Sequence, residues 1–312
     1  MDLETFAEMV CETHNLTKSG TGWPDMSTDI NKPHAWRHVK HTGWLLTSDK
    51  TIRGQTDTTF PIEIVSAILH VQPASTWRME IEHLFEALND SYEFETNRSC
   101  GFHVHLSPGN SSYKRGDWTL EELKNIAMAV VYFEDAFEVL IPETRRGSKW
   151  HRPNRAQNRR FEKLSTKQCL REISKVKDMQ ALCLLIHQTK NSNWNFMNTY
   201  YPHGIGTVEF RQPPGVTDAA GCLTWAELAV DFVQSARRPD LYAELEQYPQ
   251  TVEGLKQFCY DGMTEGVSNS KFLDPLFEGR SGALQARWAD EMEDHNALIR
   301  KECYDTKQKA RI

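Results

Sequence analysis

Apolar and polar positions follow two different periods along the chain, and together they predict mixed secondary structure. A helical spacing of apolar residues marks five segments, and the pair Thr119 and Glu122 forms a capping box ahead of the longest one. The predicted helices cover residues 3–14, 77–88, 119–140, 166–187 and 219–237, the fourth with a break near Asp178.

Shorter segments, several of them with apolar and polar residues in alternation, are predicted to be strands. They cover residues 43–49, 60–66, 100–106, 194–201 and 205–212, with the last two forming a hairpin around Pro202-His203-Gly204. Residues 15–43 are rich in Gly, Pro, Ser, Thr and Asn and are predicted to be a loop. Neighbouring strand pairs favour an antiparallel sheet, so the predicted fold class is α+β, an antiparallel sheet with helices packed on one face.

Two of these strands each carry a matched polar pair. Residues two apart in a strand point to the same face, so His103 shares a face with His105, and Glu209 shares a face with Arg211. Two imidazoles, a carboxylate and a guanidinium facing one cleft are a candidate site for a divalent metal and a phosphate. The alternatives are histidines satisfied by structural contacts and a salt bridge on an exposed sheet face.

Composition and charge narrow the class of protein. The chain has 312 residues, 39% of them hydrophobic and 25% charged, which is typical of a soluble globular protein. A net charge of −7 argues against nucleic-acid binding, and no apolar run of about 18 residues predicts a membrane span. Seven cysteines without a CxxC motif, and a start without a secretory pattern, predict a reduced, cytoplasmic protein.

One segment runs against the acidic balance. Between Arg145 and Lys163 the chain is rich in arginine, and Glu162 is the only acidic residue there. The segment is either a solvated loop or a clamp for a polyphosphate, because arginine forks match phosphate oxygens. The sequence contains no Walker loop, GxGxxG, GxSxG or HExxH motif.

The ordered set of motifs resembles the amidoligase family, and the fungal branch of that family most closely. The resemblance covers roughly residues 3–237, which we take as a catalytic domain over 1–237 with a helical extension, 238–312, packed on it. It implies the fold of the glutamine synthetase and glutamate–cysteine ligase superfamily. The motifs are Trp44…Asp49-x-x-Ile52, Glu63-Ile64-Val65-Ser66, Cys100-Gly101-Phe102-His103-Val104-His105, Asn198 and Gly206-Thr207-Val208-Glu209-Phe210-Arg211.

The resemblance implies an ATP-dependent carboxylate–amine ligase that uses Mg²⁺ and acts on an amino acid or small peptide. By position, His103 and Glu209 would be metal ligands, and His105 would line the nucleotide phosphates. Arg211 would contact the nucleotide and neutralise the transferring phosphoryl group. Glu63 would be a further metal ligand or a substrate contact.

Three more residues enter the candidate site through the same resemblance. Arg145 and Arg146 begin the basic segment where the family places a phosphate-contacting arginine. Asn198 would be a hydrogen-bonding residue on the strand before the Glu-x-Arg strand. We expect a small-molecule substrate and no nucleic-acid or membrane partner, and the sequence leaves oligomerisation open.

One departure from the family pattern separates the functional hypotheses. Family members usually open with a Gly-x-Glu-x-Glu strand whose glutamates bind metal, whereas this sequence opens almost at once with a helix. We expect either a start downstream of that strand or a reduced metal site, which would weaken phosphoryl transfer. The alternatives to an active ligase are a catalytically degenerate relative that binds nucleotide or amino acid, and a single-metal hydrolase or transferase that does not use ATP.

Overall fold

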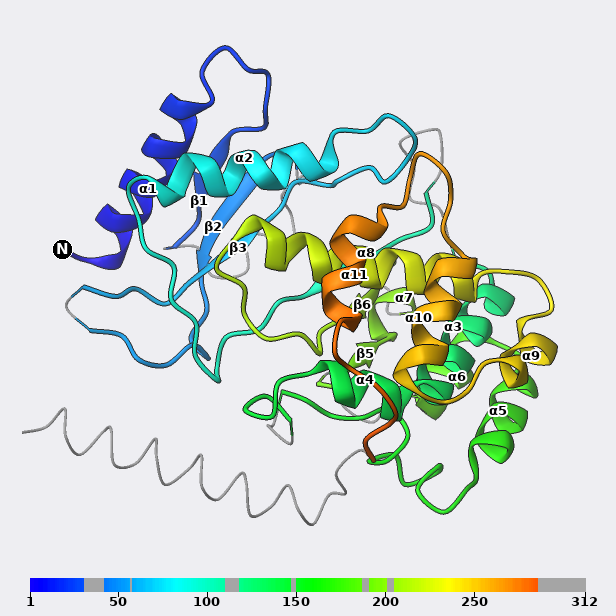
Figure 1. Ribbon diagram of the computed structural model, residues 1–312. Coiled ribbons are helices and arrows are strands. Elements are labelled where there is room, and N and C mark those ends of the chain that lie inside the picture. The colour runs from blue at the N-terminus through cyan, green and yellow to red at the C-terminus, as the bar shows by residue number, and fades with distance from the viewer. Residues whose placement is uncertain are drawn as a thin grey trace, which may run out of the picture. The chain divides into compact units, whose positions relative to one another are not determined.

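The computed structural model describes residues 1–30, 42–56, 58–109, 118–146, 150–186, 191–200 and 205–285 (Figure 1). The chain divides into two compact units, each described by itself. The first unit joins Met1–Gly101 with Gly215–Leu223, and the second joins Phe102–Pro214 with Thr224–Ile312. The predicted boundary at residue 237 stays a prediction.

The first unit begins with a helix whose start is fixed by a side chain. The Asp2 carboxylate accepts a hydrogen bond from the Thr5 N–H at 2.8 Å, which satisfies one free donor of the first turn. Ala7, Val10 and His14 share the buried face of this helix. The elements of the unit are α1 (Leu3–Thr17), β1 (Met26–Thr28), β2 (Trp44–Ser48), β3 (Ile62–Val65) and α2 (Trp77–Asn89).

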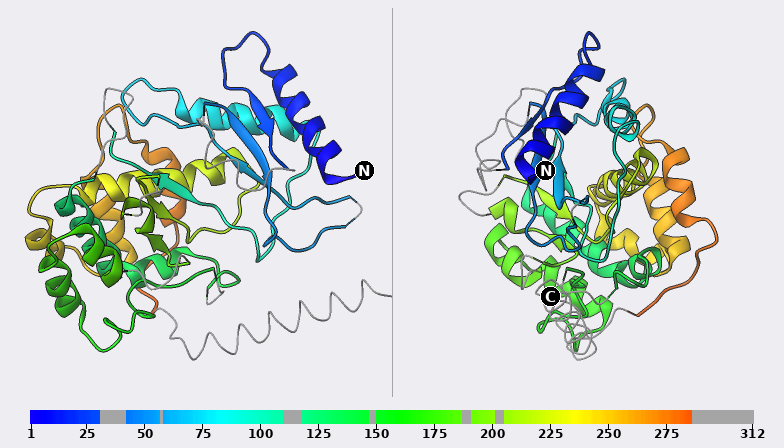
Figure 2. Two further views of the ribbon diagram at one scale, coloured as in Figure 1. Left: turned by 180° about the vertical axis from the view of Figure 1, so that it is seen from behind. Right: turned by 90° about the vertical axis from the view of Figure 1, so that its left-hand side faces the viewer.

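The sheet of the first unit has the strand order β1-β2-β3. β1 runs parallel to β2, whereas β3 runs antiparallel to β2, with Thr47 opposite Glu63. α1 packs on β1 and β2, and α2 lies beside α1 (Figures 1 and 2). Among the strands that the structure describes, β3 lies at the edge of this sheet, since its pairing partner there is β2.

The second unit holds most of the helices. Capping boxes at Thr119 with Glu122 and at Ser165 with Gln168 start α3 and α5. The elements are β4 (Val104–Leu106), α3 (Leu120–Tyr132), α4 (Glu134–Leu140), α5 (Thr166–Ser174), α6 (Met179–Ile186), β5 (Trp194–Asn195), α7 (Met197–Tyr200), β6 (Val208–Phe210), α9 (Leu241–Glu244), η2 (Leu245–Gln247), α10 (Val252–Asp261) and α11 (Ser270–Phe277). The division between the units falls within α8 (Ala219–Ala236).

The sheet of the second unit has the order β4-β6-β5, with both pairs antiparallel. Its apolar face carries a buried aromatic core. The Trp194 ring stacks on Phe210 with centroids 4.5 Å apart, and Phe232 lies 5.1 Å from Trp194 and 5.0 Å from Phe137. Aromatic burial of this kind is strongly stabilising, so β6 is held between two strands and against α4 and α8.

The basic segment lies along the outer edge of β5. Arg152 forms a parallel bridge with Ser192, and the Asn193 N–H donates to the Arg152 carbonyl at 2.7 Å. The Asn154 amide donates to the Trp194 carbonyl at 2.8 Å and accepts from the Trp194 N–H at 3.0 Å. The segment therefore extends the sheet that carries the Glu-x-Arg strand.

Several sequence predictions are confirmed. The fold is mixed α+β with helices packed around the sheets, and the break near Asp178 lies between α5 and α6. Among the described residues no helix is both long enough and apolar enough to cross a membrane. The single antiparallel sheet is wrong, because the strands form two three-stranded sheets and one of them contains a parallel pair. The predicted loop over 15–43 contains β1, which is too short to produce a recognisable alternation.

Two element predictions are also wrong. The strand predicted over 194–201 does not continue beyond Asn195 in the described residues, because the Asn195 side chain accepts from the Met197 N–H at 2.9 Å and the chain turns into α7. Pro202-His203-Gly204, the predicted turn, lies outside the described residues. The helix predicted over 119–140 is interrupted at Phe133, whose backbone (φ −98°, ψ 11°) leaves the helical conformation while its ring is fully buried.

Candidate functional site

The pairing of β4 with β6 brings the two predicted polar pairs together. His105 lies directly opposite Glu209 in the antiparallel register. His103 Nδ1 is 3.6 Å and His105 Nε2 is 3.7 Å from the same carboxylate oxygen, Glu209 Oε1. Arg211 Nη1 donates to that oxygen at 3.1 Å. The structure therefore places the four side chains in one group, which we call the Glu209 cluster.

Glu209 is the buried centre of this cluster. The residue is 5% exposed, whereas the His103 and His105 side chains are 30% and 38% exposed. Its second carboxylate oxygen, Oε2, accepts a hydrogen bond from the Asn195 amide at 2.8 Å. Burying a carboxylate requires such compensation, and here an amide, a guanidinium and two imidazoles supply it.

The pKa values of Glu209 and His103 are both lowered, but for different reasons. Burial alone would raise the pKa of Glu209, but the charges of His105 and Arg211 outweigh it and leave the pKa below its usual value. Burial, assisted by the charge of Arg211, lowers the pKa of His103 to about 4. His103 is therefore a neutral imidazole near pH 7, with a lone pair free to accept a hydrogen bond or bind a metal.

Two residues that contact the cluster were missed by the sequence analysis. Asn195 holds Glu209, and its own carbonyl oxygen accepts from the Met197 N–H. Thr207 lies 3.0 Å through its hydroxyl from His105 Nδ1, which leaves Nε2 of that ring directed at Glu209. The Thr207 position lay inside the Gly-Thr-Val-Glu motif, and alternation along the strand places it on the opposite side from Val208. No local sequence pattern pointed to Asn195, because its hydrogen-bond partner, Glu209, is 14 positions away.

The two arginines that begin the basic segment differ in their surroundings. Arg145 is 3% exposed, and its charge contributes to the lowered pKa of His103. The Arg146 side chain instead donates to the backbone carbonyls of Ile141 at 2.9 Å and Val139 at 3.4 Å. Arg145 is thus electrostatically part of the cluster, whereas Arg146 caps the end of α4.

Asn198 and Glu63 lie in other settings. Asn198 is on α7 rather than on a strand, and its carbonyl accepts from the Gly206 N–H at 2.9 Å. Asn195, three residues earlier, is the asparagine whose side chain contacts Glu209, and the binding role predicted for Asn198 stays a prediction. Glu63 belongs to the first unit, where it is exposed on β3 opposite Thr47.

The cluster fits a divalent cation only in partnership with a ligand. Among the residues that the structure describes, no group of three or more His, Cys, Asp or Glu side chains is arranged to hold a metal ion. Mg²⁺ is commonly bound by one or two carboxylates together with waters and substrate phosphates. Glu209 and the neutral His103 beside it are too few to hold such an ion by themselves and would need further ligands from water or a bound molecule.

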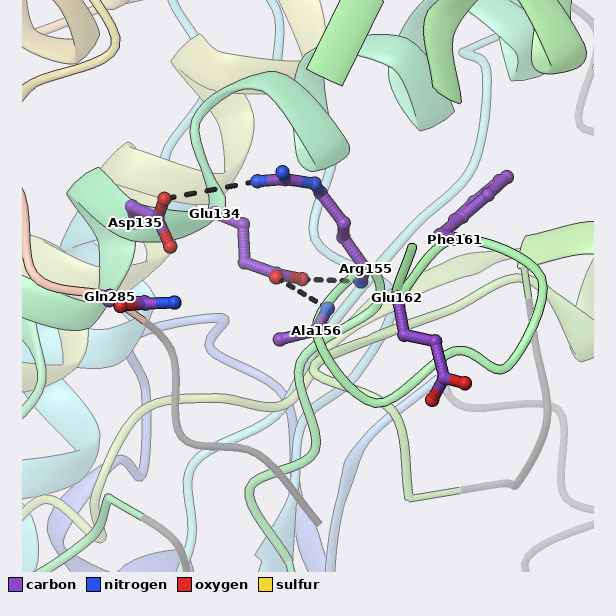
Figure 3. Close-up of a pocket in the computed structure, with 7 residues that line it drawn as sticks. All are labelled: Glu134, Asp135, Arg155, Ala156, Phe161, Glu162 and Gln285. Atoms are coloured by element: carbon purple, nitrogen blue, oxygen red, sulfur yellow. Dashed lines mark hydrogen bonds and ion pairs between the residues drawn. The ribbon is translucent and has the colours of Figure 1, made fainter. Parts of the chain in front are cut away.

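A separate cavity of about 290 Å³ lies under the basic segment (Figure 3). Glu134, at the start of α4, accepts hydrogen bonds from the backbone N–H groups of Arg155 at 2.6 Å and Ala156 at 2.9 Å. Arg155 Nη1 is 3.9 Å from Asp135 Oδ2. These contacts hold the middle of the basic segment against α4, so this part of it is an ordered structural turn.

The fold and the cluster define an α+β protein with a buried polar cluster built on the central strand of a small sheet. The model of the family described as "Putative amidoligase enzyme" matches residues 18–233, well over half of the chain. The chain belongs to this family, which confirms the prediction from its motifs. No curated protein and no solved structure matches the chain. Placement in the fungal branch and in the glutamine synthetase superfamily stays a prediction.

Proposed function

We propose that the protein is an ATP-dependent carboxylate–amine ligase with a glutamine-synthetase-like catalytic fold. The observation that carries the proposal is the Glu209 cluster, in which Arg211 and two imidazoles surround one buried carboxylate. Family membership supports a ligase reaction, and the cationic side chains support a polyphosphate substrate.

The reaction would proceed in two steps. In the first, an oxygen of the substrate carboxylate attacks the γ-phosphorus of ATP, the bond to ADP breaks, and an acyl phosphate forms. In the second, the nitrogen of an amine attacks the acyl carbon, inorganic phosphate leaves with its bonding electrons, and the nitrogen loses a proton. The products are an amide, ADP and phosphate. We propose an amino acid or a small peptide as the carboxylate substrate.

The residues of the cluster would act through charge and position. Arg211 would neutralise the oxygens of the phosphoryl group in transfer, where positioned cationic donors have their largest effect. His105, held by Thr207, would line the nucleotide phosphates, and Arg145 would add long-range positive potential. His103 and Glu209 would hold Mg²⁺. The ion would supply charge neutralisation on the nucleotide phosphates.

The direct test is release of ADP by the full-length chain. We expect ADP and phosphate from ATP and Mg²⁺ in the presence of a pool of amino acids and dipeptides, with an amide product detected by mass spectrometry. Arg211→Gln should reduce the rate by about a hundredfold or more. Arg171→Gln, which removes an exposed arginine on α5, is the matched control and should leave the rate unchanged. A folded chain that releases no ADP with any substrate mixture would overturn the proposal.

One observation favours a second candidate, a relative that binds nucleotide without turnover. Both oxygens of Glu209 are already engaged by the protein, Oε2 by Asn195 and Oε1 by Arg211. A carboxylate held in this way organises an anion site without binding a metal. Calorimetry decides between the candidates, since heat of binding for Mg·ATP without ADP release identifies the non-catalytic protein.

A further inference from the structure

A second buried polar network lies in the same unit as the Glu209 cluster. It consists of Glu138 on α4, His151 in the basic segment and Gln212, which directly follows Arg211. Each of these residues is 1% exposed. Glu138 Oε1 is 3.1 Å from His151 Nε2 and 3.3 Å from Gln212 Nε2, and the two nitrogens are 3.0 Å apart.

This network joins the segments that supply the cluster. Gln212 is adjacent in sequence to Arg211, and the Arg211 N–H donates to the Asn193 carbonyl at 2.9 Å. The Asn193 amide is 3.4 Å from His151 Nε2, and its backbone N–H donates to Arg152. One carboxylate on α4 thus connects the end of β6, the start of β5 and the basic segment.

The cost of burying a carboxylate restricts the geometry of this network. A fully buried carboxylate is costly unless hydrogen-bond donors surround it, so Glu138 constrains where the His151 ring and the Gln212 amide can lie. α4 is itself fixed, because Phe137 packs against Trp194 and Phe210 with ring centroids 6.0 and 5.8 Å apart. A shift of Gln212 would move Arg211, and Arg211 holds Glu209 Oε1 at 3.1 Å.

We propose that Glu138 is a positioning residue for the Glu209 cluster. Through Gln212 it sets the place of Arg211, and through His151 it sets the place of the basic segment. Together these contacts fix the spacing of the cationic groups that would meet the phosphates of a nucleoside triphosphate. The ligand class rests on the proposed function, whereas the effect of Glu138 on the cluster does not require any ligand.

The chain offers a matched control one helical turn away. Glu134 is also a buried carboxylate on α4 and also contacts the basic segment, through the backbone N–H groups of Arg155 and Ala156. None of the bonds described for Glu134 reaches β6. Glu138→Gln and Glu134→Gln therefore change the same chemical group on the same helix, but only the first alters the contacts of Gln212.

The experiment compares these variants in two ways. In the ligand-free protein labelled with [¹⁵N]histidine, we expect Glu138→Gln to shift the ring signals of His103 and His105, identified by their loss in His103→Gln and His105→Gln. We expect Glu134→Gln to leave these signals in place. By calorimetry, Glu138→Gln should weaken binding of a non-hydrolysable ATP analogue by about tenfold, and Glu134→Gln should not.

The outcomes separate the two proposals. Wild-type ring signals in folded Glu138→Gln, or equal shifts in both variants, would overturn the positioning role. Shifted signals in a protein that binds no analogue would support the positioning role and count against the proposed function. If Glu138→Gln does not fold, Gln212→Met serves in its place, because it keeps the Glu138–His151 pair and removes the Gln212 contacts that link this pair to β6. The same ring shifts are expected, and their absence would overturn the proposal.

Discussion

Glu63 and Glu209 occupy nearly identical local sequences and have very different environments. Each lies between two apolar residues of a short strand, Ile62 and Ile64 in the first unit and Val208 and Phe210 in the second. Glu63 is exposed, whereas Glu209 is 5% exposed and bonded through both oxygens. The alternation of side chains predicts the face on which a carboxylate lies, and it does not predict its burial.

The position of the strand in its sheet accounts for the difference. β3 is an edge strand with β2 as its neighbour, whereas β6 is the central strand between β4 and β5. A central strand receives partners from two sides, and here these are His105 on β4 and Asn195 on β5. A polar residue on a central strand therefore contacts side chains of both neighbouring strands, and the sequence of its own strand does not reveal which residues these are.

The largest expected effect on stability is that of removing the Glu209 carboxylate, with removal of the Glu63 carboxylate as the comparison. Glu209→Ala leaves the Arg211 guanidinium, whose side chain is mostly buried, without its ion-pair partner, so we expect the free energy of unfolding to fall by about 3 kcal/mol. Glu63→Ala should change it by no more than about 0.5 kcal/mol, because the side chain is exposed. Urea denaturation measures both values. Equal losses in the two variants would contradict the contrast between the strands.

The pH dependence of stability extends the comparison to Glu134, a buried carboxylate for which the described residues provide no ion pair. Burial raises the pKa of Glu134 to about 8. The folded state then keeps a proton that the unfolded state has released, so this residue lowers stability progressively as the pH rises from about 4.5 to about 8. Glu209, with a lowered pKa, contributes stability above its unfolded value and loses it only as the pH falls through the folded value.

Glu134→Gln should therefore lessen the loss of stability on the alkaline side. We expect the variant to gain about 2 kcal/mol relative to the wild type between about pH 5 and about pH 8, since the amide has no proton to release. Denaturation curves at a series of pH values measure the difference. A parallel pH profile for the two proteins would show that the two backbone N–H bonds to Glu134 keep it ionised.

The smallest expected effect distinguishes the two asparagines. Asn195→Ala removes the amide donor to Glu209 Oε2 and should lower the free energy of unfolding by about 1.5 kcal/mol. Asn198→Ala removes a side chain on α7 and should cost less than about 0.5 kcal/mol, since its described contact is made by its backbone. A greater loss in Asn198→Ala than in Asn195→Ala would restore the sequence-based assignment.

The sequence predicted what local patterns can encode. The capping box at Thr119, the break near Asp178 and the shared faces of His103 with His105 and of Glu209 with Arg211 all follow from spacings of two to four residues. The approach of these two pairs to each other was an inference from chemistry, and the β4–β6 pairing confirms it. Family membership followed from the order of several such motifs.

The remaining features depend on contacts between distant segments. Asn195, Thr207 and the Glu138–His151 pair become part of the second unit's polar networks only when β4, β5, β6 and α4 assemble. The division of the strands into two sheets could not be predicted from the sequence either, because the length of a strand does not reveal which strand it pairs with. α7 replaced the end of a predicted strand because one side chain, Asn195, offered its acceptor to a nearby N–H.

The pairing of Asn154 with Trp194 has a consequence for the behaviour of the protein in concentrated solution. β5 ends its sheet, and the free backbone groups of such a strand are a template on which another chain can add. By bonding both the N–H and the carbonyl of Trp194, the Asn154 amide occupies the groups that a foreign strand would use. A second copy could therefore pair with Trp194 only by displacing the Asn154 amide from these two groups.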